Sequence, residues 1–281
     1  MSRHLHDSLG GHYAAGDLLE AVQRALRELD TEPGALSHRQ WAALDEFHVR
    51  GAEASRELAG WLGVASHWRV LDLGCGLGGP ARHLAREHGC RVLGVDLTAD
   101  YCRVGQWLTR QLGLTERVAF IQADAAHLPL TDGAFDAVWT QHTAMNIPHK
   151  AGFYGEIRRV LKPGGQLALY DVLAGPGGEP HYPVPWASRA EQSFLAAPET
   201  LREHLHDAGF SVTHWRDVSA EGLTWFQRQQ ARGGPPRALG LHLLLGPAFP
   251  EMIRNLRRNL AEQRVILLEV VARVTPGALP G

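Results

Sequence analysis

From residue 68 onward, short apolar runs alternate with segments of helical periodicity, and this alternation limits the fold more than any other feature of the chain. The helical segments PARHLAREHG and TADYCRVGQWLTRQLG separate the first three runs, which are WRVLDLG, CRVLGVDL and RVAFIQAD. Further runs are FDAVWTQ, QLALYDVL, SVTHWRDV and VILLEVVARV. Because the runs are too apolar to have a face in water, we expect the strands of a parallel sheet covered by helices on both sides. The sequence therefore predicts a doubly wound α/β fold.

Three parts of the chain are expected around this sheet. Residues 1–66 are predicted to form an N-terminal helical cap, residues 67–175 the core, and residues 176–281 lid segments that also complete the sheet as one unit with the core. Helices are predicted over residues 16–62, with a break at Pro33-Gly34 and a second helix that starts after Ser37 as its N-cap. Residues 174–197 and 219–262 exceed the length of ordinary connections, which is typical of lids or binding elements.

The composition argues against several classes of function. The net charge is −2 with neutral histidines, and no block of Lys and Arg stands out, so a nucleic-acid-binding surface is not expected. No apolar run is long enough for a membrane span and no secretion signal is visible, so no membrane partner is expected and a cytoplasmic location is predicted. Neither the cysteines nor the histidines have metal-ligand spacing, so no metal site is expected. A homodimer is compatible with the sequence, which does not decide the oligomeric state.

A glycine-rich segment follows the first predicted strand and opens a helix. Its residues, Gly74-Cys75-Gly76-Leu77-Gly78-Gly79, satisfy the G-x-G-x-x-G pattern of dinucleotide-binding proteins. Asp72 argues against a dinucleotide, because a carboxylate at the end of this strand would repel a pyrophosphate and suits an ammonium group instead. Asp96, at the end of the second strand, is placed to bind ribose hydroxyls in either case. Asp124 and Ala125 end the third strand, where a carboxylate can meet an adenine amino group.

Five stretches of the chain, VLDLGCGLGG, VLGVDL, ADAAHLPL, FDAVWTQHTAMNI and RRVLKPGGQLALYD, resemble the class I S-adenosylmethionine-dependent methyltransferases. The resemblance covers roughly residues 68–215 and is greatest with small-molecule N- and C-methyltransferases such as the sarcosine/dimethylglycine and tocopherol enzymes. It implies a Rossmann-like, seven-stranded, mostly parallel sheet of order 3-2-1-4-5-7-6 with an antiparallel last strand. It also implies that the core of residues 67–175 binds S-adenosyl-L-methionine and releases S-adenosyl-L-homocysteine.

The resemblance further implies roles for residues at the strand ends. Nine of them are assigned to the cofactor: Asp72, Gly74, Cys75, Gly76, Asp96, Leu97, Asp124, Ala125 and Gln141. The glycines let the backbone approach the methionine part, whose amino group Asp72 supports, and Asp96 takes the ribose. Gln141 lies beside the sulfonium. Cys75 is expected to pack beneath the loop, because methyl transfer needs no covalent enzyme intermediate.

The methyl acceptor is expected near the segments that follow the fourth and fifth strands, because ligands of such folds bind at the carboxyl ends of the strands. His142 is the first candidate for a general base or an acceptor-orienting group, since an imidazole pKa lies near neutrality; the alternative is a histidine that only supports its loop. Tyr182 is the second catalytic candidate. Residues expected to contact the acceptor, with simple packing as the alternative for the aromatic ones, are Tyr13, Met145, Asn146, His181, Trp186 and Trp225.

A sulfonium is an activated methyl donor, so the enzyme's task is to align the acceptor atom with the methyl carbon. We expect a small-molecule acceptor, and the aromatic lid favours an indole- or amine-containing metabolite through stacking and cation–π contact. Thr140-Gln141-His142-Thr143 lacks the tetrapeptide of DNA amino-methyltransferases. The alternatives are a regulatory or non-catalytic protein that binds the cofactor and, less favoured, a dinucleotide oxidoreductase.

Overall fold

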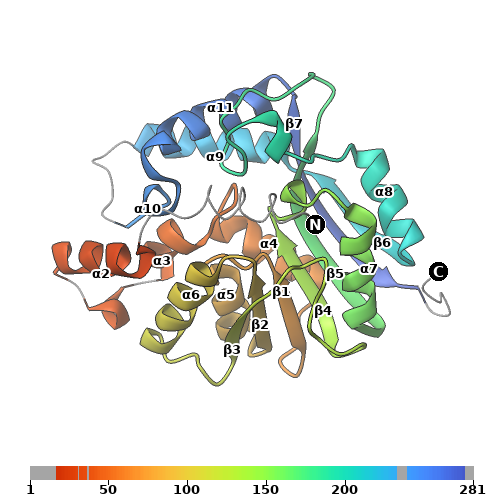
Figure 1. Ribbon diagram of the computed structural model, residues 1–281, viewed down its shortest axis with the longest axis horizontal. Helices are drawn as coiled ribbons and strands as arrows, with labels where there is room; N and C mark the ends of the chain where they lie inside the picture. Colours follow the sequence, from red (N-terminus) through yellow and green to blue (C-terminus); the bar gives the residue numbers. More distant parts are fainter. Residues whose placement is uncertain (1–16, 31, 37, 233–238, 276–281) are drawn as a thin grey trace.

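The computed structural model describes residues 17–30, 32–36, 38–232 and 239–275. Within these ranges the chain builds a seven-stranded sheet of order β3-β2-β1-β4-β5-β7-β6 (Figure 1). The strands are β1 (Arg69–Leu73), β2 (Arg91–Asp96), β3 (Val118–Gln122), β4 (Phe135–Gln141), β5 (Leu161–Ala174), β6 (Phe210–Asp217) and β7 (Val265–Val274). Strand β7 runs antiparallel to β5 and β6, and the other pairings are parallel. The predicted fold class and strand order are confirmed.

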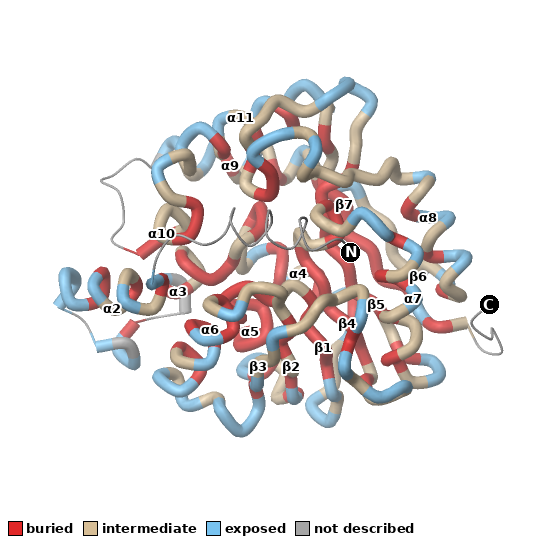
Figure 2. Tube along the Cα trace, in the orientation of Figure 1, coloured by how far each residue is buried: buried red, intermediate tan, exposed pale blue. Residues whose placement is uncertain are grey.

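Helices cover both faces of the sheet, because successive strand residues point to opposite sides. Val70 and Val92 pack with α4 (Ala52–Leu62) and α5 (Gly79–His88). Leu71 and Leu73 pack on the opposite face with α7 (Lys150–Val160) and α8 (Pro198–Asp207). A third apolar cluster joins α2 (Leu18–Glu28) to α6 (Ala99–Gln111). Figure 2 shows the result, a buried sheet under helices whose outer surfaces are exposed.

The N-terminal helices differ from the prediction at one place. Instead of one helix over residues 37–62, the structure has α3 (His38–Asp45) and α4, separated by the loop of residues 46–51. Arg50 and Gly51 interrupt the helix with φ angles of 69° and 48°. The buried Arg50 guanidinium, which pairs with Glu269 at 2.9 Å and with Glu57, holds the left-handed conformation. Ser37, the expected N-cap, lies outside the described residues.

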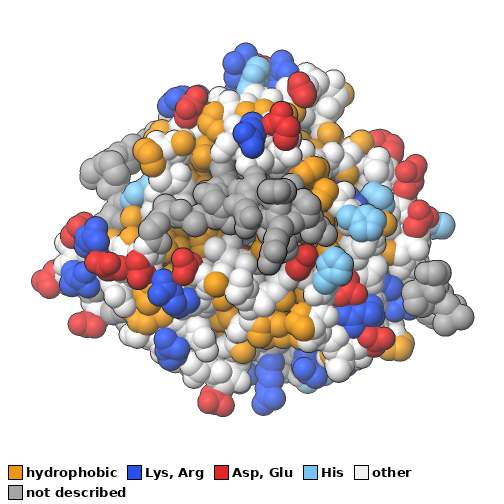
Figure 3. Space-filling view, viewed as in Figure 1, with side chains coloured by type: hydrophobic (Ala, Val, Ile, Leu, Met, Phe, Trp, Pro, Cys, Tyr) orange, Lys and Arg blue, Asp and Glu red, His pale blue; other side chains and the backbone are white. Residues whose placement is uncertain are grey.

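The second long insertion folds into helices between β6 and β7. They are α9 (Ser219–Arg232), α10 (His242–Leu245) and α11 (Phe249–Ala261); α9 and α11 lie side by side at the top of Figure 1, and α10 lies below them toward α2. Short 3₁₀ turns are η1 (Pro33–Ala35), η2 (Ala144–Asn146), η3 (Ala190–Gln192) and η4 (Gly246–Ala248). Among the described helices, none is long and apolar enough to span a membrane. On the face seen in Figure 3, acidic and basic side chains are interspersed and lie mostly toward the rim.

Candidate active site

One large pocket opens where the carboxyl ends of β1 to β5 meet the inserted helices. Its space amounts to about 1300 Å³, a figure that includes open solvent at the mouth. We call one part of its lining the cofactor half: Gly74, Gly76, Val95, Asp96, Leu97, Thr98, Tyr101, Ala123, Asp124, Ala125 and Thr143. The acceptor half consists of Phe47, His48, Val49, His142, Met145, Asn146, Ile147, Pro185, Trp186, Trp225, Phe226, Leu241, Leu245, Ile253 and Leu256.

The glycine-rich loop between β1 and α5 forms the floor of the cofactor half. Gly74 has a φ of 70°, and a Cβ there would lie 2.1 Å from Thr143 Oγ1. Thr143 itself is fixed, because its hydroxyl lies 3.2 Å from the Leu73 carbonyl oxygen and 3.1 Å from that of Gln141. A side chain at Gly74 would therefore both strain the backbone and displace Thr143. At Gly76 (φ 53°) a Cβ would meet nothing within 4 Å, so this position faces open space.

Asp96 ties the end of β2 to the glycine loop. Its carboxylate accepts hydrogen bonds from the backbone N–H groups of Gly76 and Thr98, both at 2.9 Å. Each carboxylate oxygen retains a lone pair, so Asp96 can also accept from the hydroxyls of a ribose. Asp124, after β3, is held similarly by the backbone N–H of Ala126 at 2.9 Å. Both carboxylates are thus oriented before a ligand arrives.

Asp72 is buried at the end of β1 and does not itself line the pocket. Burial, and secondarily the nearby Asp96, raises the pKa of Asp72 to about 8. Its Oδ2 has no hydrogen-bond partner among the described residues. An unpartnered buried carboxyl oxygen costs free energy that a ligand ammonium group would recover. The residue therefore fits the cationic amino group that the sequence analysis assigned to it.

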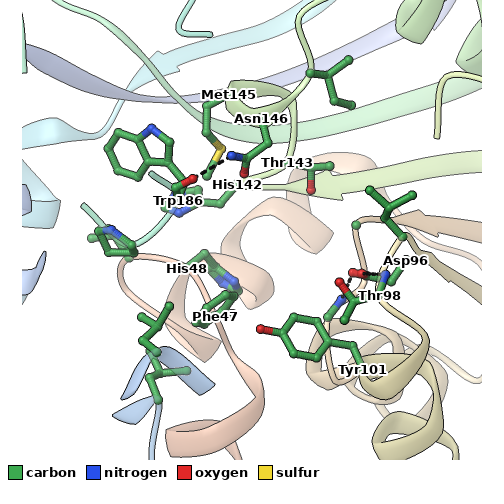
Figure 4. Close-up of a pocket in the computed structure, with 18 of the residues that line it drawn as sticks. Phe47, His48, Asp96, Thr98, Tyr101, His142, Thr143, Met145, Asn146 and Trp186 are labelled. Atoms are coloured by element: carbon green, nitrogen blue, oxygen red, sulfur yellow. Dashed lines mark hydrogen bonds between the residues drawn. The ribbon is translucent and has the colours of Figure 1, made fainter. Parts of the chain in front are cut away.

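The acceptor half is apolar and aromatic. Figure 4 shows Trp186, Met145 and Phe47 on one side of the pocket and Asp96, Thr98 and Tyr101 on the other. The inserted segment that carries α9 to α11 completes it with one aromatic pair and four aliphatic side chains. The rings of the pair, Trp225 and Phe226, are 5.1 Å apart. The described lining of this half contains no Lys, Arg, Asp or Glu. It therefore suits an uncharged ligand.

A buried lysine fixes the loop after β4, which carries Met145 and Asn146. Lys150 Nζ donates to the carbonyl oxygens of Ala144 at 2.6 Å, Ile147 at 2.5 Å and Phe194 at 2.7 Å. The third bond reaches the segment that follows β5, so one ammonium group joins two walls of the pocket. Asn146 adds a second link by donating to the Trp186 carbonyl oxygen at 2.8 Å, drawn as a dashed line in Figure 4.

The comparisons with known proteins agree with this division. Residues 71–169, which carry most of the cofactor half, match the family model described as a methyltransferase domain. The chain carries an S-adenosylmethionine-dependent methyltransferase domain of class I.

Curated relatives extend the likeness beyond the matched domain. Methyltransferase GfsG from Streptomyces halstedii is 34% identical over 161 residues, which cover 56% of this chain and 57% of GfsG. A sterol 24-C-methyltransferase from Eremothecium gossypii is 39% identical over 127 residues, 45% of this chain and 34% of that protein. This chain therefore spans between a third and somewhat more than half of these relatives.

Solved structures match a larger share of the chain. The cyclase SpnF has a TM-score of 0.65 and 26% identity, covering 93% of this chain and 95% of SpnF. A geranyl diphosphate methyltransferase solved with S-adenosylmethionine has a TM-score of 0.66 at 20% identity, covering 80% of this chain and 86% of that one, which shows the shared fold.

Most of the expected site residues line the pocket, and five of the described ones do not: Asp72, treated above, Cys75, Gln141, Tyr182 and His181. Cys75 is buried under the loop, as its sulfur would lie 2.9 Å from a Cβ at Gly94. Gln141 lies one layer behind the wall and accepts a hydrogen bond from Trp139 Nε1 at 2.9 Å. Tyr182 is outside the pocket lining and packs against the core beside it. His181 turns to Glu262, at 2.8 Å, instead of the pocket. Tyr13 and the histidines before it lie outside the described residues.

His142 lies where the sequence placed it, on the rim directly after β4. Its φ of 49° is in the left-handed region, and its backbone N–H donates to the Tyr170 carbonyl oxygen at 2.7 Å. The imidazole packs against the Tyr170 ring, with centroids 4.8 Å apart. Burial, and then the neighbouring His48, lowers the pKa of His142 well below its usual range, so the ring is neutral.

The loop of residues 46–51 was not predicted from the sequence, and it brings Phe47, His48 and Val49 into the pocket. The continuous helical pattern on both sides of it concealed the break. The signal was present at Gly51, a residue that often interrupts a helix. The helix α11 residues Ile253 and Leu256 were also missed, because their apolar spacing is equally typical of a helix that only packs on the core.

Proposed function

We propose that the protein transfers the methyl group of S-adenosylmethionine to an uncharged, largely apolar small molecule. One observation carries this proposal: a half that fits the cofactor and an aromatic half without Lys, Arg, Asp or Glu share one pocket. The curated relatives are methyltransferases, and two of those cited are named for small-molecule acceptors, sterols and glycine derivatives, but they are matched only in part. The whole protein's activity is therefore inferred from its own pocket.

The work of the residues would be alignment. The cofactor, when bound, supplies an activated methyl group, so most of the rate enhancement must come from holding the acceptor atom in line at about 3–3.5 Å. Asp96 and Asp124 would fix the ribose and the adenine, and Asp72 the amino group. Trp186 and Trp225 would hold the acceptor by its faces, and the loop pinned by Lys150 would set the distance between the two.

The acceptor half refines the expectation of an indole or an amine. An indole fits the aromatic walls and carries no charge. A protonated amine would gain cation–π contact, but the carboxylates of the pocket lining, Asp96 and Asp124, belong to the cofactor half. A buried cation without a carboxylate partner is costly. We therefore place indoles and other neutral aromatic or terpenoid-like molecules ahead of amines.

Binding and transfer can be tested separately. S-adenosylhomocysteine at a hundredfold excess over its Kd should stabilise the protein by about 2.7 kcal/mol, whereas NAD should leave its Tm unchanged. Methyl-tritiated S-adenosylmethionine is then incubated with indole, tryptamine, 1-naphthol and geraniol, and the products are extracted and counted. Label in the neutral acceptors at higher kcat/KM than in tryptamine supports the proposal. Stabilisation by NAD alone would refute the cofactor assignment.

A second candidate has one observation in its favour. SpnF, a cyclase, matches nearly its full length at 26% identity, and an apolar pocket also suits the folding of a hydrocarbon chain. Cyclisation leaves the mass of the substrate unchanged, whereas methylation adds the mass of one CH₂ group. Mass spectrometry of products formed with and without S-adenosylmethionine therefore separates the two activities.

A further inference from the structure

Two histidines, His48 and His142, line the acceptor half, and their ring centroids are 5.9 Å apart. A histidine that takes a proton from a ligand must offer one unprotonated ring nitrogen and carry N–H on the other. That second nitrogen needs a hydrogen-bond acceptor, because taking up the proton makes the whole ring positive. His48 and His142 differ in the atoms that surround this second ring nitrogen.

The Nε2 atom of His48 has a hydrogen-bond acceptor beside it. It lies 3.1 Å from the Gly51 carbonyl oxygen, 3.3 Å from Ser55 Oγ and 3.4 Å from Glu46 Oε2. Its fourth neighbour, the Gln141 amide nitrogen at 3.3 Å, can only donate. The Gly51 carbonyl oxygen can only accept and is the nearest of the four atoms, so it places the hydrogen on Nε2 and leaves the lone pair on Nδ1.

The other nitrogen of His48 is the one that remains for a ligand. Nδ1 makes none of the hydrogen bonds found among the described residues. The His48 side chain is only 3% exposed but lines the pocket, so a ligand bound there would meet Nδ1. Figure 4 shows the ring beside Phe47, across the pocket from the labelled residues of the cofactor half.

His142 lacks the same support. Its Nε2 is sealed from solvent and has no hydrogen-bond partner among the described residues. A proton taken up at Nδ1 would leave a charged ring with a buried N–H that nothing accepts, which is costly. His142 can accept a hydrogen bond from a ligand and orient it, but it is poorly built to become positive.

We propose that His48, and not His142, is the catalytic base of the methyl transfer, a role that rests on the proposed function. The acceptor atom forms a bond to the methyl carbon, the carbon–sulfur bond breaks with its electron pair remaining on sulfur, and the acceptor's proton passes to His48 Nδ1. The products are the methylated acceptor, neutral S-adenosylhomocysteine and a positively charged His48, which returns its proton to water when the pocket opens.

The surroundings of His48 make this step favourable in two ways. Burial lowers the pKa of His48 to about 4, so the free ring is unprotonated at any physiological pH. The sulfonium already carries the positive charge that His48 takes over, so the total charge in the pocket does not change during the transfer. Burial opposes a charged His48 ring in the empty site, and it therefore opposes that ring less during the reaction. Burial, together with Asp45, raises the pKa of Glu46 to about 8, and a charged His48 at 3.4 Å would favour its ionisation.

The assignment narrows the acceptor class. A base at this position is needed when the acceptor atom carries a proton that leaves during transfer, as in a phenol, an enol or an indole N–H or C–H. A neutral tertiary amine or a plain alkene would not use His48 at its first step. The acceptor is therefore a neutral aromatic or enolic X–H compound.

The first test needs no acceptor. The full chain is labelled with ¹⁵N-histidine and saturated with S-adenosylhomocysteine, and long-range ¹H–¹⁵N correlations are recorded from pH 5 to 8, with His48→Gln used to assign the signal. We expect His48 to be neutral throughout, with hydrogen on Nε2 and not on Nδ1. Hydrogen on Nδ1, or a charged ring at pH 7, would overturn the proposal.

The second test compares two matched variants on whichever of indole or 1-naphthol the wild type methylates, because geraniol offers an alkene carbon that would not need His48 at its first step. In His48→Gln the amide can still donate to Gly51, but the basic nitrogen is gone, so kcat should fall about 10²- to 10⁴-fold. His142→Gln should lose less than about tenfold, and both should bind S-adenosylhomocysteine within about threefold of the wild type. An unchanged kcat in His48→Gln excludes the base. Methylation of geraniol alone would contradict the proposed acceptor class. A wild type that methylates none of indole, 1-naphthol and geraniol refutes the proposed function instead, and the spectroscopic test still decides the state of His48.

Discussion

The two halves of the pocket are built in different ways. The cofactor half is made by short segments that each directly follow a strand, and its contacts are largely backbone contacts such as those of Asp96 with Gly76 and Thr98. The acceptor half is assembled from the loop of residues 46–51, the loop after β4 and helices α9 to α11. A half fixed by the sheet leaves a local motif in the sequence. A half assembled by packing of distant segments does not.

The largest expected effect is a loss of stability from a substitution in the glycine loop, which forms the floor of the cofactor half. In Gly74→Ala, the strain of the left-handed backbone and the clash with Thr143 should lower the free energy of unfolding by about 2–4 kcal/mol. Gly76→Ala is the matched control, because it has the same kind of φ but open space for its Cβ, and about 1 kcal/mol is expected. Urea unfolding measures both. Equal losses would show that the approach to Thr143 does not matter.

Asp96→Ala tests whether the cofactor half binds by its carboxylates. Removing the acceptor of ribose hydroxyls should weaken S-adenosylhomocysteine binding by about 1–3 kcal/mol, measured by calorimetry. Trp225→Ala, in the acceptor half, should leave that affinity within about threefold. A comparable loss in both variants would mean that the halves are not separate.

A smaller effect is expected from Glu46, which stands behind the acceptor half. Its pKa is raised to about 8 from 4.5, so between these values the folded protein holds a proton that the unfolded chain has released. The free energy of unfolding of the wild type therefore falls as pH rises. Glu46→Gln lacks this titration, so its free energy of unfolding relative to that of the wild type should rise by about 1 kcal/mol between pH 6 and pH 7.

The control for Glu46→Gln is Glu57→Gln. Hydrogen bonds with Arg50 and Arg216 outweigh the effect of burial and lower the pKa of Glu57. Its own stabilisation is complete above the unfolded pKa and is lost only in acid, so Glu57 itself does not titrate between pH 6 and pH 7. The stability difference from wild type should therefore change less over this range than for Glu46→Gln, since Glu57 only adds to the effect of burial that raises the pKa of Glu269 to about 7. If the free energies of unfolding of the wild type and of Glu46→Gln changed in parallel between pH 6 and pH 7, Glu46 would not titrate in this range.

No effect is expected from chelation. Among the described residues, no group of three or more His, Cys, Asp or Glu side chains could hold a metal ion, and a sulfonium donor needs no Lewis acid. Methyl transfer measured after dialysis against EDTA should equal that of the untreated protein. A loss of activity that Mg²⁺ restores would contradict this and would indicate a metal-bound acceptor.

The sequence was sufficient for the sheet because apolar runs and glycine turns are local signals. For the same reason it placed the strand-end residues Gly74, Asp96 and Asp124 at the pocket, while their roles toward the cofactor stay predictions. It was not sufficient for His48, because the helical periodicity before and after the loop masked a break that Arg50 stabilises through a distant partner, Glu269. His181 was expected in the pocket from its proximity in sequence to Trp186, but its contact with Glu262 depends on the path of the lid.

The position of the inserted helices has a consequence for exchange of specificity between proteins. Helices α9 to α11 are bracketed by two strands that pair with each other, with Asp217 opposite Leu268 and the Val218 N–H donating to the Leu267 carbonyl oxygen at 2.9 Å. The two ends of the insertion therefore lie side by side on an antiparallel ladder that is complete without it. A different helical segment with the same closely spaced ends could be grafted there without moving the strands that carry the cofactor half. In this architecture, a new acceptor preference could be acquired by replacing the single inserted segment that carries α9 to α11.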